Sequence, residues 1–330
     1  MKAKQINLIN YPIGVPKNSD FKFEEIQIDS LKSGEVLLEP QYISVDPYMR
    51  GRMTLSKSYV PPFELNKPIS GGVVAKVVDS KSELYKEGDL VLGTLPWATL
   101  VVSNGEGLQK LPTDIKPSYF LGILGMPGLT AYCGLLEICT PRKGETVVVS
   151  GAAGAVGTIV GQIAKIKGCH VVGIAGDDVK VNLLQEHFDF DHAINYKTHN
   201  IDEKLREYCP HGVDCYYDNV GGEITDVVIN HFNKNARMAL CGQIALYNDV
   251  KISLGPRFLP TILKTSSLIK GFIVSDYADK FPAASQQLAQ WVKQGDLKYK
   301  ETIIEGFDNI PEAFLGLFTG KNRGKMVVKI

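Results

Sequence analysis

The segment of clearest chemical meaning is Thr146–Gly157, TVVVSGAAGAVG. Its β-branched residues predict a strand buried on both faces, and its glycines predict a tight turn that lets the backbone approach a ligand. Apolar residues at helical spacing follow from Val156 to Ala164, and the predicted helix ends at Gly168. A strand, a tight turn and a helix N-terminus form a site for a pyrophosphate, because free N–H groups and the helix dipole face the anion. The segment therefore predicts a nucleotide-dependent enzyme.

This turn departs from the usual G-x-G-x-x-G pattern at its first glycine, where Ala152 stands. Such a pattern alone is weak evidence, and its place between a strand and a helix strengthens it. The next predicted strand ends in Ala175 and Gly176. It therefore lacks the Asp or Glu that binds the ribose hydroxyls in NAD-preferring enzymes. Asp177 follows at once, and we interpret it as a helix N-cap.

Metal ligands are scarce in the first third of the chain. No Cys occurs before Cys133, and the first His is His170. A zinc site needs imidazole or thiolate ligands at close spacing, and the later histidines do not cluster in this way. We therefore expect no metal. The six cysteines include no C-x-x-C pair, and we expect them to be reduced thiols.

Bulk composition excludes several other classes of protein. The 330 residues suffice for two domains, and Lys+Arg and Asp+Glu both number 36, so no overall positive charge favours nucleic acid. The N-terminal residues lack the apolar stretch of a signal peptide. Two charge-free stretches, 117–136 and 146–164, are broken by glycines and are expected to be core, not membrane spans. We expect a soluble cytoplasmic protein that binds neither nucleic acid nor membrane.

The pattern of elements changes along the chain. Short strands separated by Pro and Gly are expected at 35–45, 71–78, 89–92 and 99–102, and residues 119–139 look helical on either side of Pro127–Gly128. From residue 145 onward, strands alternate with helices, which predicts a doubly wound parallel sheet. The expected strands of this sheet are 146–150, 170–175, 193–196, 213–218, 237–241 and 268–274. Asp177, Asp202 and Glu223 are expected near helix starts, and a last strand at 325–330 could return to the first domain.

Seven short motifs in register resemble one family. They are DPYMRGRM (46–53), GMPGLTAY (125–132), SGAAGAVG (150–157), NYKT (195–198), DNVGG (218–222), CGQIALYN (241–248) and GFIV (271–274). The chain resembles a zinc-independent medium-chain dehydrogenase/reductase of the prostaglandin reductase, leukotriene 12-hydroxydehydrogenase and alkenal double-bond reductase group. The resemblance implies an α/β fold with a Rossmann doubly wound parallel sheet and a GroES-like, mostly β catalytic domain. It implies a catalytic domain at 1–122, an NADP-binding domain at 123–300, a return segment at 301–330, and a homodimer.

NADPH is the cofactor that the resemblance implies. Residues at the positions of Lys180 and Tyr196 bind its extra phosphate in this family, and a charge and a hydroxyl donor suit that group. Taken alone, Lys180 would be interpreted as a solvated lysine and Tyr196 as an ordinary aromatic. The absence of an acidic residue at the end of the second strand makes NADPH the favoured cofactor. The other expected cofactor contacts are Met126, Thr130, Ala152, Ala153, Gly154, Ala155, Val156, Gly157, Asn219, Cys241, Gly242, Gln243, Ile244, Tyr247, Phe272, Ile273, Val274 and Asn322.

The implied reaction is hydride transfer to the β-carbon of an enone or a 2-alkenal. Such a conjugated carbonyl needs an oriented cofactor and a donor to the enolate oxygen, not a metal. Tyr247 is the first candidate donor and Tyr48 the second. Arg50 could anchor an acidic substrate tail, although a solvated charge is the commoner outcome. Tyr59 and Trp97 could line an apolar pocket, or they could be ordinary core or surface aromatics.

Two other functions stay open at this stage. An NADPH:quinone oxidoreductase would need a similar site, and a non-catalytic nucleotide-binding protein would keep the turn without the reaction. The sequence Tyr247-Asn-Asp-Val-Lys251 also matches the Y-x-x-x-K pair of short-chain dehydrogenases. That pair requires a helix, and Asn-Asp after a strand predicts a turn, so we interpret the match as coincidence. Some relatives carry a tyrosine in the segment before the sixth strand, near the place of Lys264 here, and this difference favours a simpler or a different enone over lipid mediators.

Overall fold

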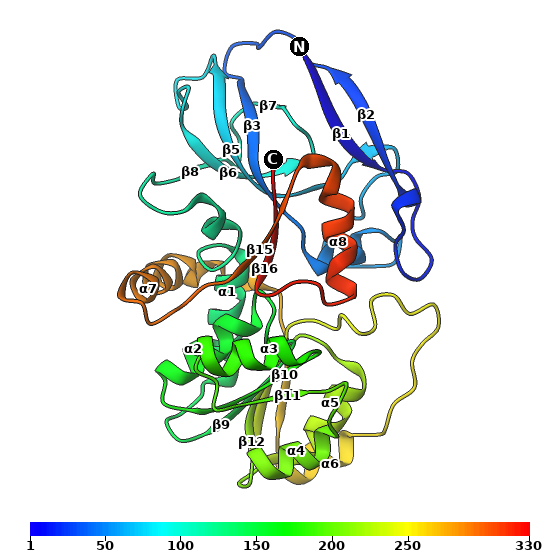
Figure 1. The fold of residues 1–330 in the computed structure, drawn as a ribbon, viewed down its shortest axis with the longest axis vertical. Coiled ribbons are helices and arrows are strands. Elements are labelled where there is room, and N and C mark those ends of the chain that lie inside the picture. Colours follow the sequence, from blue (N-terminus) through cyan, green and yellow to red (C-terminus); the bar gives the residue numbers. More distant parts are fainter. The chain divides into compact units, whose positions relative to one another are not determined.

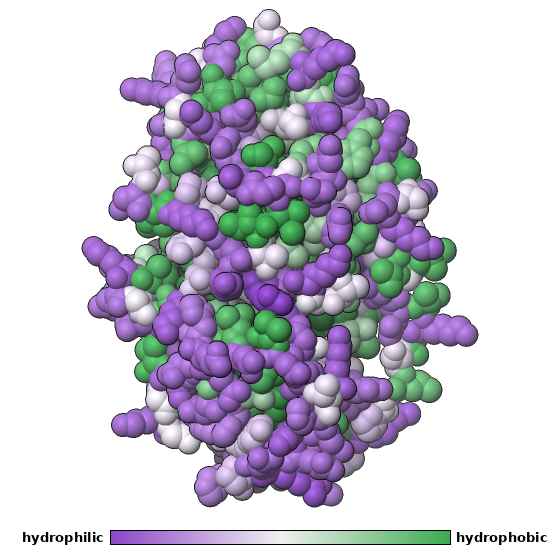
Figure 2. Space-filling model, viewed as in Figure 1, coloured by the Kyte–Doolittle hydropathy of each residue, from purple (hydrophilic) through white to green (hydrophobic).

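The computed structural model describes residues 1–330, which divide into two compact units (Figure 1). The β unit contains Met1–Leu121, Glu301–Asn322 and Met326–Ile330. The α/β unit contains Gly122–Lys300 and Arg323–Lys325. None of the helices combines the length and the apolar character needed to cross a bilayer. On the face drawn in Figure 2, hydrophilic residues predominate and apolar residues form small separate groups.

A six-stranded parallel sheet forms the centre of the α/β unit, in the order β11-β10-β9-β12-β13-β14. Numbered within this sheet, the order is 3-2-1-4-5-6, which is that of a doubly wound, Rossmann-type fold. The strands are β9 (Thr146–Ser150), β10 (His170–Ala175), β11 (His192–Asn195), β12 (Val213–Asp218), β13 (Phe232–Leu240) and β14 (Leu268–Gly271). The predicted α/β class is confirmed.

The central strands are easy to predict from the sequence, because burial on both faces makes them continuous apolar runs. Every residue of β9 is buried, because helices cover both faces of the sheet. Three strand predictions match the structure, and three differ: β11 lies one residue earlier, β13 begins earlier, and β14 ends at Gly271. The helices of the unit are α1 (Met126–Cys133), α2 (Gly157–Ile166), α3 (Asp178–Asn182), α4 (Ile201–Tyr208), α5 (Gly222–Val228), α6 (Leu259–Thr265) and α7 (Phe281–Gln294).

Most of the predicted helix starts agree with the structure. Helical segments lie on either side of Pro127–Gly128, as predicted, at Pro117–Leu121 and from Met126 onward. Pro127 itself lies in the first turn of α1, where proline loses no backbone hydrogen bond. The Asp177 carboxylate accepts from the Lys180 amide at 2.8 Å, so its predicted N-cap role is confirmed. Asp202 and Glu223 lie in the first turns of α4 and α5, as predicted. The cap of α4 is Asn200, whose side chain accepts from the amides of Asp202 and Glu203.

The β unit contains a seven-stranded sheet and a three-stranded sheet. The C-terminal strand β16 (Lys325–Lys329) pairs antiparallel with β3, with Val327 opposite Ser44, so the predicted return of the last strand is confirmed. Strands β1, β2 and β15 were not predicted, because charged residues interrupt their apolar pattern. The elements are β1 (Lys2–Leu8), β2 (Phe21–Gln27), β3 (Val36–Ser44), β4 (Lys67–Pro68), β5 (Ser70–Ser80), β6 (Leu90–Pro96), β7 (Val101–Ser103), β8 (Gln109–Lys110), β15 (Glu301–Glu305), α8 (Ile310–Phe318) and β16.

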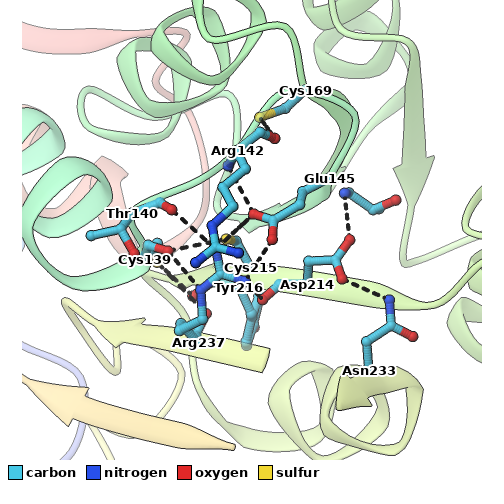
Figure 3. A network of polar contacts seen from close by, with 11 residues as sticks. Cys139, Thr140, Arg142, Glu145, Cys169, Asp214, Cys215, Tyr216, Asn233 and Arg237 are labelled. Carbon is cyan, nitrogen blue, oxygen red and sulfur yellow. Dashed lines mark hydrogen bonds and ion pairs between the residues drawn. The ribbon is translucent and has the colours of Figure 1, made fainter. Parts of the chain in front are cut away.

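A polar network holds the amino ends of the parallel strands together (Figure 3). Arg237 on β13 donates to both carboxylate oxygens of Glu145, at 3.1 and 2.6 Å, and Glu145 directly precedes β9. The same guanidinium donates to the carbonyls of Cys139 and Thr140 at 2.8 and 3.1 Å, where the helical segment after α1 ends. Because a planar guanidinium presents five donors, one side chain ties three segments to this edge of the sheet.

Replacing Glu145 with Gln should lower the free energy of unfolding by about 1–3 kcal/mol at neutral pH, because charge-assisted hydrogen bonds are lost. Burial opposes ionisation, yet hydrogen bonds from Arg237 and the Arg142 amide hold the pKa of Glu145 below its ordinary value. The charge therefore stabilises the fold above the ordinary pKa, and this contribution disappears as the pH falls through the folded pKa.

Urea unfolding of both proteins over a series of pH values measures this difference. Glu312→Gln removes a carboxylate from an exposed pair with Lys321 and should change stability little. A wild-type advantage over Glu145→Gln that stays constant into strongly acid pH would show that the charge is not its source.

Candidate functional site

Within the α/β unit, most of the residues predicted to bind a cofactor follow the carboxyl ends of the parallel strands. Parallel strands end at the same edge of their sheet, so segments distant in sequence become neighbours there. The segment after each strand contributes: Ala152–Gly157 after β9, Lys180 after β10, Tyr196 after β11, Asn219 after β12, Cys241–Ile244 and Tyr247 after β13, and Phe272–Val274 after β14. Met126 and Thr130 lie on α1, and the Thr130 hydroxyl donates to the Met126 carbonyl at 2.7 Å.

The glycine turn after β9 presents backbone N–H groups at the start of a ten-residue helix, α2. Ala152 and Ala153 are buried, whereas residues 154–156 are partly exposed. The amides of Ala155 and Val156 take no part in the backbone hydrogen bonds of the turn. A Cβ at Gly157 would lie 2.4 Å from the Gly151 carbonyl oxygen, so the turn closes this tightly only with glycine. The arrangement suits an anion such as a pyrophosphate.

Strands β9 and β12 are neighbours at the point where the strand order reverses. The amide and the side-chain nitrogen of Asn219 donate to the Ser150 hydroxyl and carbonyl, at 2.9 and 2.8 Å. Dinucleotides bind doubly wound sheets at this reversal. Asn219 therefore lies at the strand reversal, and its contact with the cofactor stays a prediction.

A cationic cluster lies beyond β10 and β11. Lys180 is 8% exposed, and its amine lies 4.0 Å from the Asp177 carboxylate. Burial lowers the pKa of Lys180, and the positive charges of Lys197 and Arg323 lower it further. The Tyr196 ring packs over Gly176, where an added Cβ would meet it at 3.0 Å. One buried cation, two exposed cations and a phenol suit a phosphate. The last residue of β10 is Ala175, and the nearby Asp177 carboxylate caps α3.

Arg323 was not predicted to belong to this cluster. It belongs to the short segment of the α/β unit that lies nearest the C-terminus of the chain. The following amide, Gly324, donates to the Ala153 carbonyl at 2.8 Å and pairs in parallel with Gly154. The GKNRGK turn holds a basic residue beside Asn322, but only tertiary pairing brings it to the glycine turn. Asn322 itself ends the Glu301–Asn322 segment of the β unit.

The loop after β13 folds back on itself through Tyr247. The Gln243 amide donates to the Tyr247 hydroxyl oxygen at 3.2 Å, so the tyrosine's own proton is available for a ligand. Burial raises the pKa of Tyr247, so the phenol stays protonated. Residues 247–251 form no helix, as predicted, so Tyr247 and Lys251 do not form the short-chain pair. Burial also raises the pKa of Cys241 to about 12, which fits our view that it is no nucleophile.

In the β unit, Tyr48 lies on the short helix Pro47–Arg52 that follows β3. Burial and the nearby Asp46 raise the pKa of Tyr48 to about 12, so it remains a donor at neutral pH. Tyr59 is exposed.

Two predictions in the β unit are wrong. Arg50 is buried, and its guanidinium donates to the carbonyls of Pro12 and Gly14 at 3.1 and 3.0 Å, so it fastens a loop instead of facing a substrate. Trp97 is fully buried in the core, stacked on Phe21 at 6.4 Å between ring centres, and therefore lines no accessible pocket.

Nowhere in the structure do three or more His, Cys, Asp or Glu side chains converge as a metal site would require. Sequence reasoning assigned no role to Asp218, the first residue of the DNVGG motif, which is fully buried at the carboxyl edge.

Two protein-family models match the chain. One, described as the N-terminal domain of oxidoreductase, matches residues 4–111, and the other, described as zinc-binding dehydrogenase, matches residues 155–290. Among curated proteins, the Bacillus subtilis protein YfmJ, whose name describes an NADP-dependent oxidoreductase, is 54% identical over 99% of this chain and 97% of its own. Prostaglandin reductase 1 of Bos taurus is 46% identical over 99% of each chain. The NADP-dependent 2-alkenal reductase of Nicotiana tabacum is 42% identical over 99% and 97%.

Solved structures agree with these relatives. CurA from Vibrio vulnificus in complex with NADPH superposes with a TM-score of 0.94 at 40% identity, over 99% of this chain and 98% of its own. An Escherichia coli quinone oxidoreductase with NADPH reaches a TM-score of 0.77 at only 19% identity, over 99% and 100%, so it shares the fold alone. The chain therefore belongs to the medium-chain dehydrogenase/reductase family, within the zinc-independent group that contains the prostaglandin reductases and the 2-alkenal reductases.

Proposed function

We propose that this protein is an NADPH-dependent reductase of activated carbon–carbon double bonds, acting on small conjugated carbonyls such as enones and 2-alkenals. The observation that carries the proposal is the Lys180 and Tyr196 cluster beside a dinucleotide turn, in a chain whose relatives are named as NADP-dependent and alkenal reductases. The quinone oxidoreductase alternative has no comparable support, because that relative shares only the fold.

The chain offers a group for each part of the cofactor. The amides of the 152–157 turn would hold the pyrophosphate, and Lys180, Tyr196, Lys197 and Arg323 would surround the extra phosphate. NADPH, when bound, supplies the hydride that adds to the β-carbon of the conjugated carbonyl. The ribose and nicotinamide would contact Met126, Thr130, Asn219, Cys241–Ile244, Tyr247, Phe272–Val274 and Asn322.

The protein's own task is to orient the reactants and to stabilise charge on the carbonyl oxygen. Tyr247 suits the second task, because its hydroxyl oxygen already accepts from the Gln243 amide and its proton is left to donate. Tyr48 is the second candidate donor, since its raised pKa keeps it protonated. Tyr59 would provide apolar contact. A proton from solvent or from a tyrosine then completes the reduction at the α-carbon.

Loss of NADPH absorbance with a panel of enones, 2-alkenals and quinones tests this function. We expect the highest kcat/KM for an enone or alkenal, with the saturated carbonyl as product. Faster turnover of quinones would favour the alternative reductase. NADPH binding without turnover of any conjugated carbonyl would leave a non-catalytic nucleotide-binding protein.

Tyr247→Phe should lower kcat in the same assay by about tenfold or more, because one donor to the developing charge is lost. NADPH affinity should change much less. Tyr208→Phe, on α4, removes a phenol stacked on His192 and should leave kcat unchanged. Equal kcat in Tyr247→Phe and wild type would remove Tyr247 from the mechanism.

Lys180→Ala should weaken NADPH by about tenfold to a hundredfold and NADH little, since a charged hydrogen bond to the phosphate is lost. Arg323→Ala should act in the same direction with a smaller effect. The matched control is Lys204→Ala, which removes a cation from an exposed helical pair with Glu207. Fluorescence titration with NADPH and NADH gives the ratio of their dissociation constants. If this ratio is the same in Lys180→Ala and in wild type, Lys180 does not hold the extra phosphate.

A homodimer is the proposed assembly. Strand β14 is an outer strand of the parallel sheet, and Leu268 on it, with Leu259 and Leu263 on α6, is exposed. A second copy of this chain could pair edge to edge and cover them. Light scattering should give a dimer for wild type and a monomer for Leu259→Asp/Leu263→Asp, whereas Leu84→Asp in the β unit should remain dimeric. A monomeric wild type would contradict the assembly.

We also propose that the protein acts in the cytoplasm. All six cysteines are unpaired, which fits a reducing compartment. Zero net charge gives no reason to expect nucleic acid as a partner. Cell fractionation with an antibody to the protein tests the location, and recovery in an extracellular fraction would contradict it.

A further inference from the structure

Asp218, the last residue of β12, is a fully buried carboxylate surrounded by hydrogen-bond donors. Its Oδ1 accepts from the Ser150 hydroxyl at 2.7 Å, the Tyr216 hydroxyl at 2.9 Å, and the amides of Val220 and Gly221 at 3.1 and 3.0 Å. Its Oδ2 accepts from the Thr225 hydroxyl and the Gln243 side-chain amide, both at 2.8 Å. A buried carboxylate is costly unless such donors compensate it.

These donors come from segments that are far apart in sequence. Ser150 ends β9 beside the glycine turn, Thr225 lies on α5, and Gln243 belongs to the loop after β13. The backbone carbonyl of Asp218 also accepts from the amides of Cys241 and Gly242, at 2.9 and 3.1 Å. One residue therefore connects the turn, the strand reversal and the loop that carries Tyr247.

The connection to this loop is geometrically specific. Gly221 has φ +75°, and a Cβ there would lie 2.2 Å from the Gln243 side-chain oxygen. Gln243 is thus packed against the DNVGG turn while its amide nitrogen donates to Asp218. The Gln243 backbone amide in turn donates to the Tyr247 hydroxyl. Movement of Gln243 would displace Tyr247.

We propose that Asp218 is a positioning residue for the dinucleotide: its buried carboxylate fixes the glycine turn, Asn219 and the 241–247 loop in their binding geometry. The inference rests on the proposed function, because it concerns the same cofactor. The hydrogen-bond donors around Asp218 explain why its side chain is held in one orientation. Three of the six donors, the amides of Val220 and Gly221 and the side-chain NH₂ group of Gln243, can only donate, so they hold both oxygens of the Asp218 side chain in one orientation.

Asp218→Asn tests the role with almost no change in size. If the side-chain oxygen of the substituted residue still accepts from the amides of Val220 and Gly221, the new NH₂ group faces Thr225 and Gln243. The Thr225 hydroxyl can rotate to accept, but the Gln243 NH₂ group cannot. Turning the Gln243 amide over would let its oxygen accept, but it would break the 2.9 Å hydrogen bond that its nitrogen donates to the Gly242 carbonyl, so the loop loses one of its contacts in either case. The variant therefore keeps most of the network and removes one contact of the loop that carries Tyr247.

The matched control is Glu145→Gln, at the opposite end of the same sheet. Both variants should lower Tm, because both remove a hydrogen-bonded carboxylate. NADPH affinity, from fluorescence titration, should weaken by about tenfold in Asp218→Asn and stay within about twofold in Glu145→Gln. In steady state, the KM for NADPH should rise in Asp218→Asn while the KM for the enone stays near that of wild type.

Thr225→Val provides a second variant in case Asp218→Asn does not fold. It removes one donor to Oδ2 and should weaken NADPH by about two- to fivefold. A folded Asp218→Asn protein with lowered Tm and wild-type NADPH affinity would show that Asp218 is only structural, as would unaltered affinity in Thr225→Val if only that variant folds. Wild-type protein that fails to bind NADPH would instead contradict the proposed function, so the two failures are distinguishable.

Discussion

Parallel pairing makes the carboxyl ends of all strands of a sheet lie at one edge, and the arrangement of the candidate cofactor site follows from this constraint. Segments from Ala152 to Val274 meet at the carboxyl edge because β9 to β14 run in the same direction. The free amides at the start of α2 lie at the same edge. A dinucleotide that spans this edge can therefore contact residues separated by most of the unit's sequence.

Each edge of this sheet is fastened by a carboxylate, and the two carboxylates differ in kind. At the amino edge, Glu145 pairs with the Arg237 guanidinium and joins strands to a helical segment. At the carboxyl edge, neutral donors surround Asp218, so its charge fixes the binding segments without placing a cation near them. The cations at that edge lie instead around Lys180, where a phosphate would compensate them.

The wrong predictions in the β unit have a common cause. Arg50 and Trp97 belong to residue types that often bind ligands, and each lies near a predicted loop or strand end. In the fold, the Arg50 donors are used by the carbonyls of a distant loop, and the Trp97 ring fills the core against Phe21. Residue type alone cannot separate these outcomes, since both depend on segments that are remote in sequence.

The sequence by itself determined the strand–turn–helix unit at 146–166, the alternation of strands and helices, the N-cap at Asp177 and the family motifs. These are local properties, because side-chain periodicity and glycine placement act within a few residues. Only the tertiary structure brought Arg323 to the glycine turn, buried Arg50 and Trp97, and gathered six donors around Asp218. Such contacts join residues far apart in the chain, and the pairing and packing that create them leave no periodic signal.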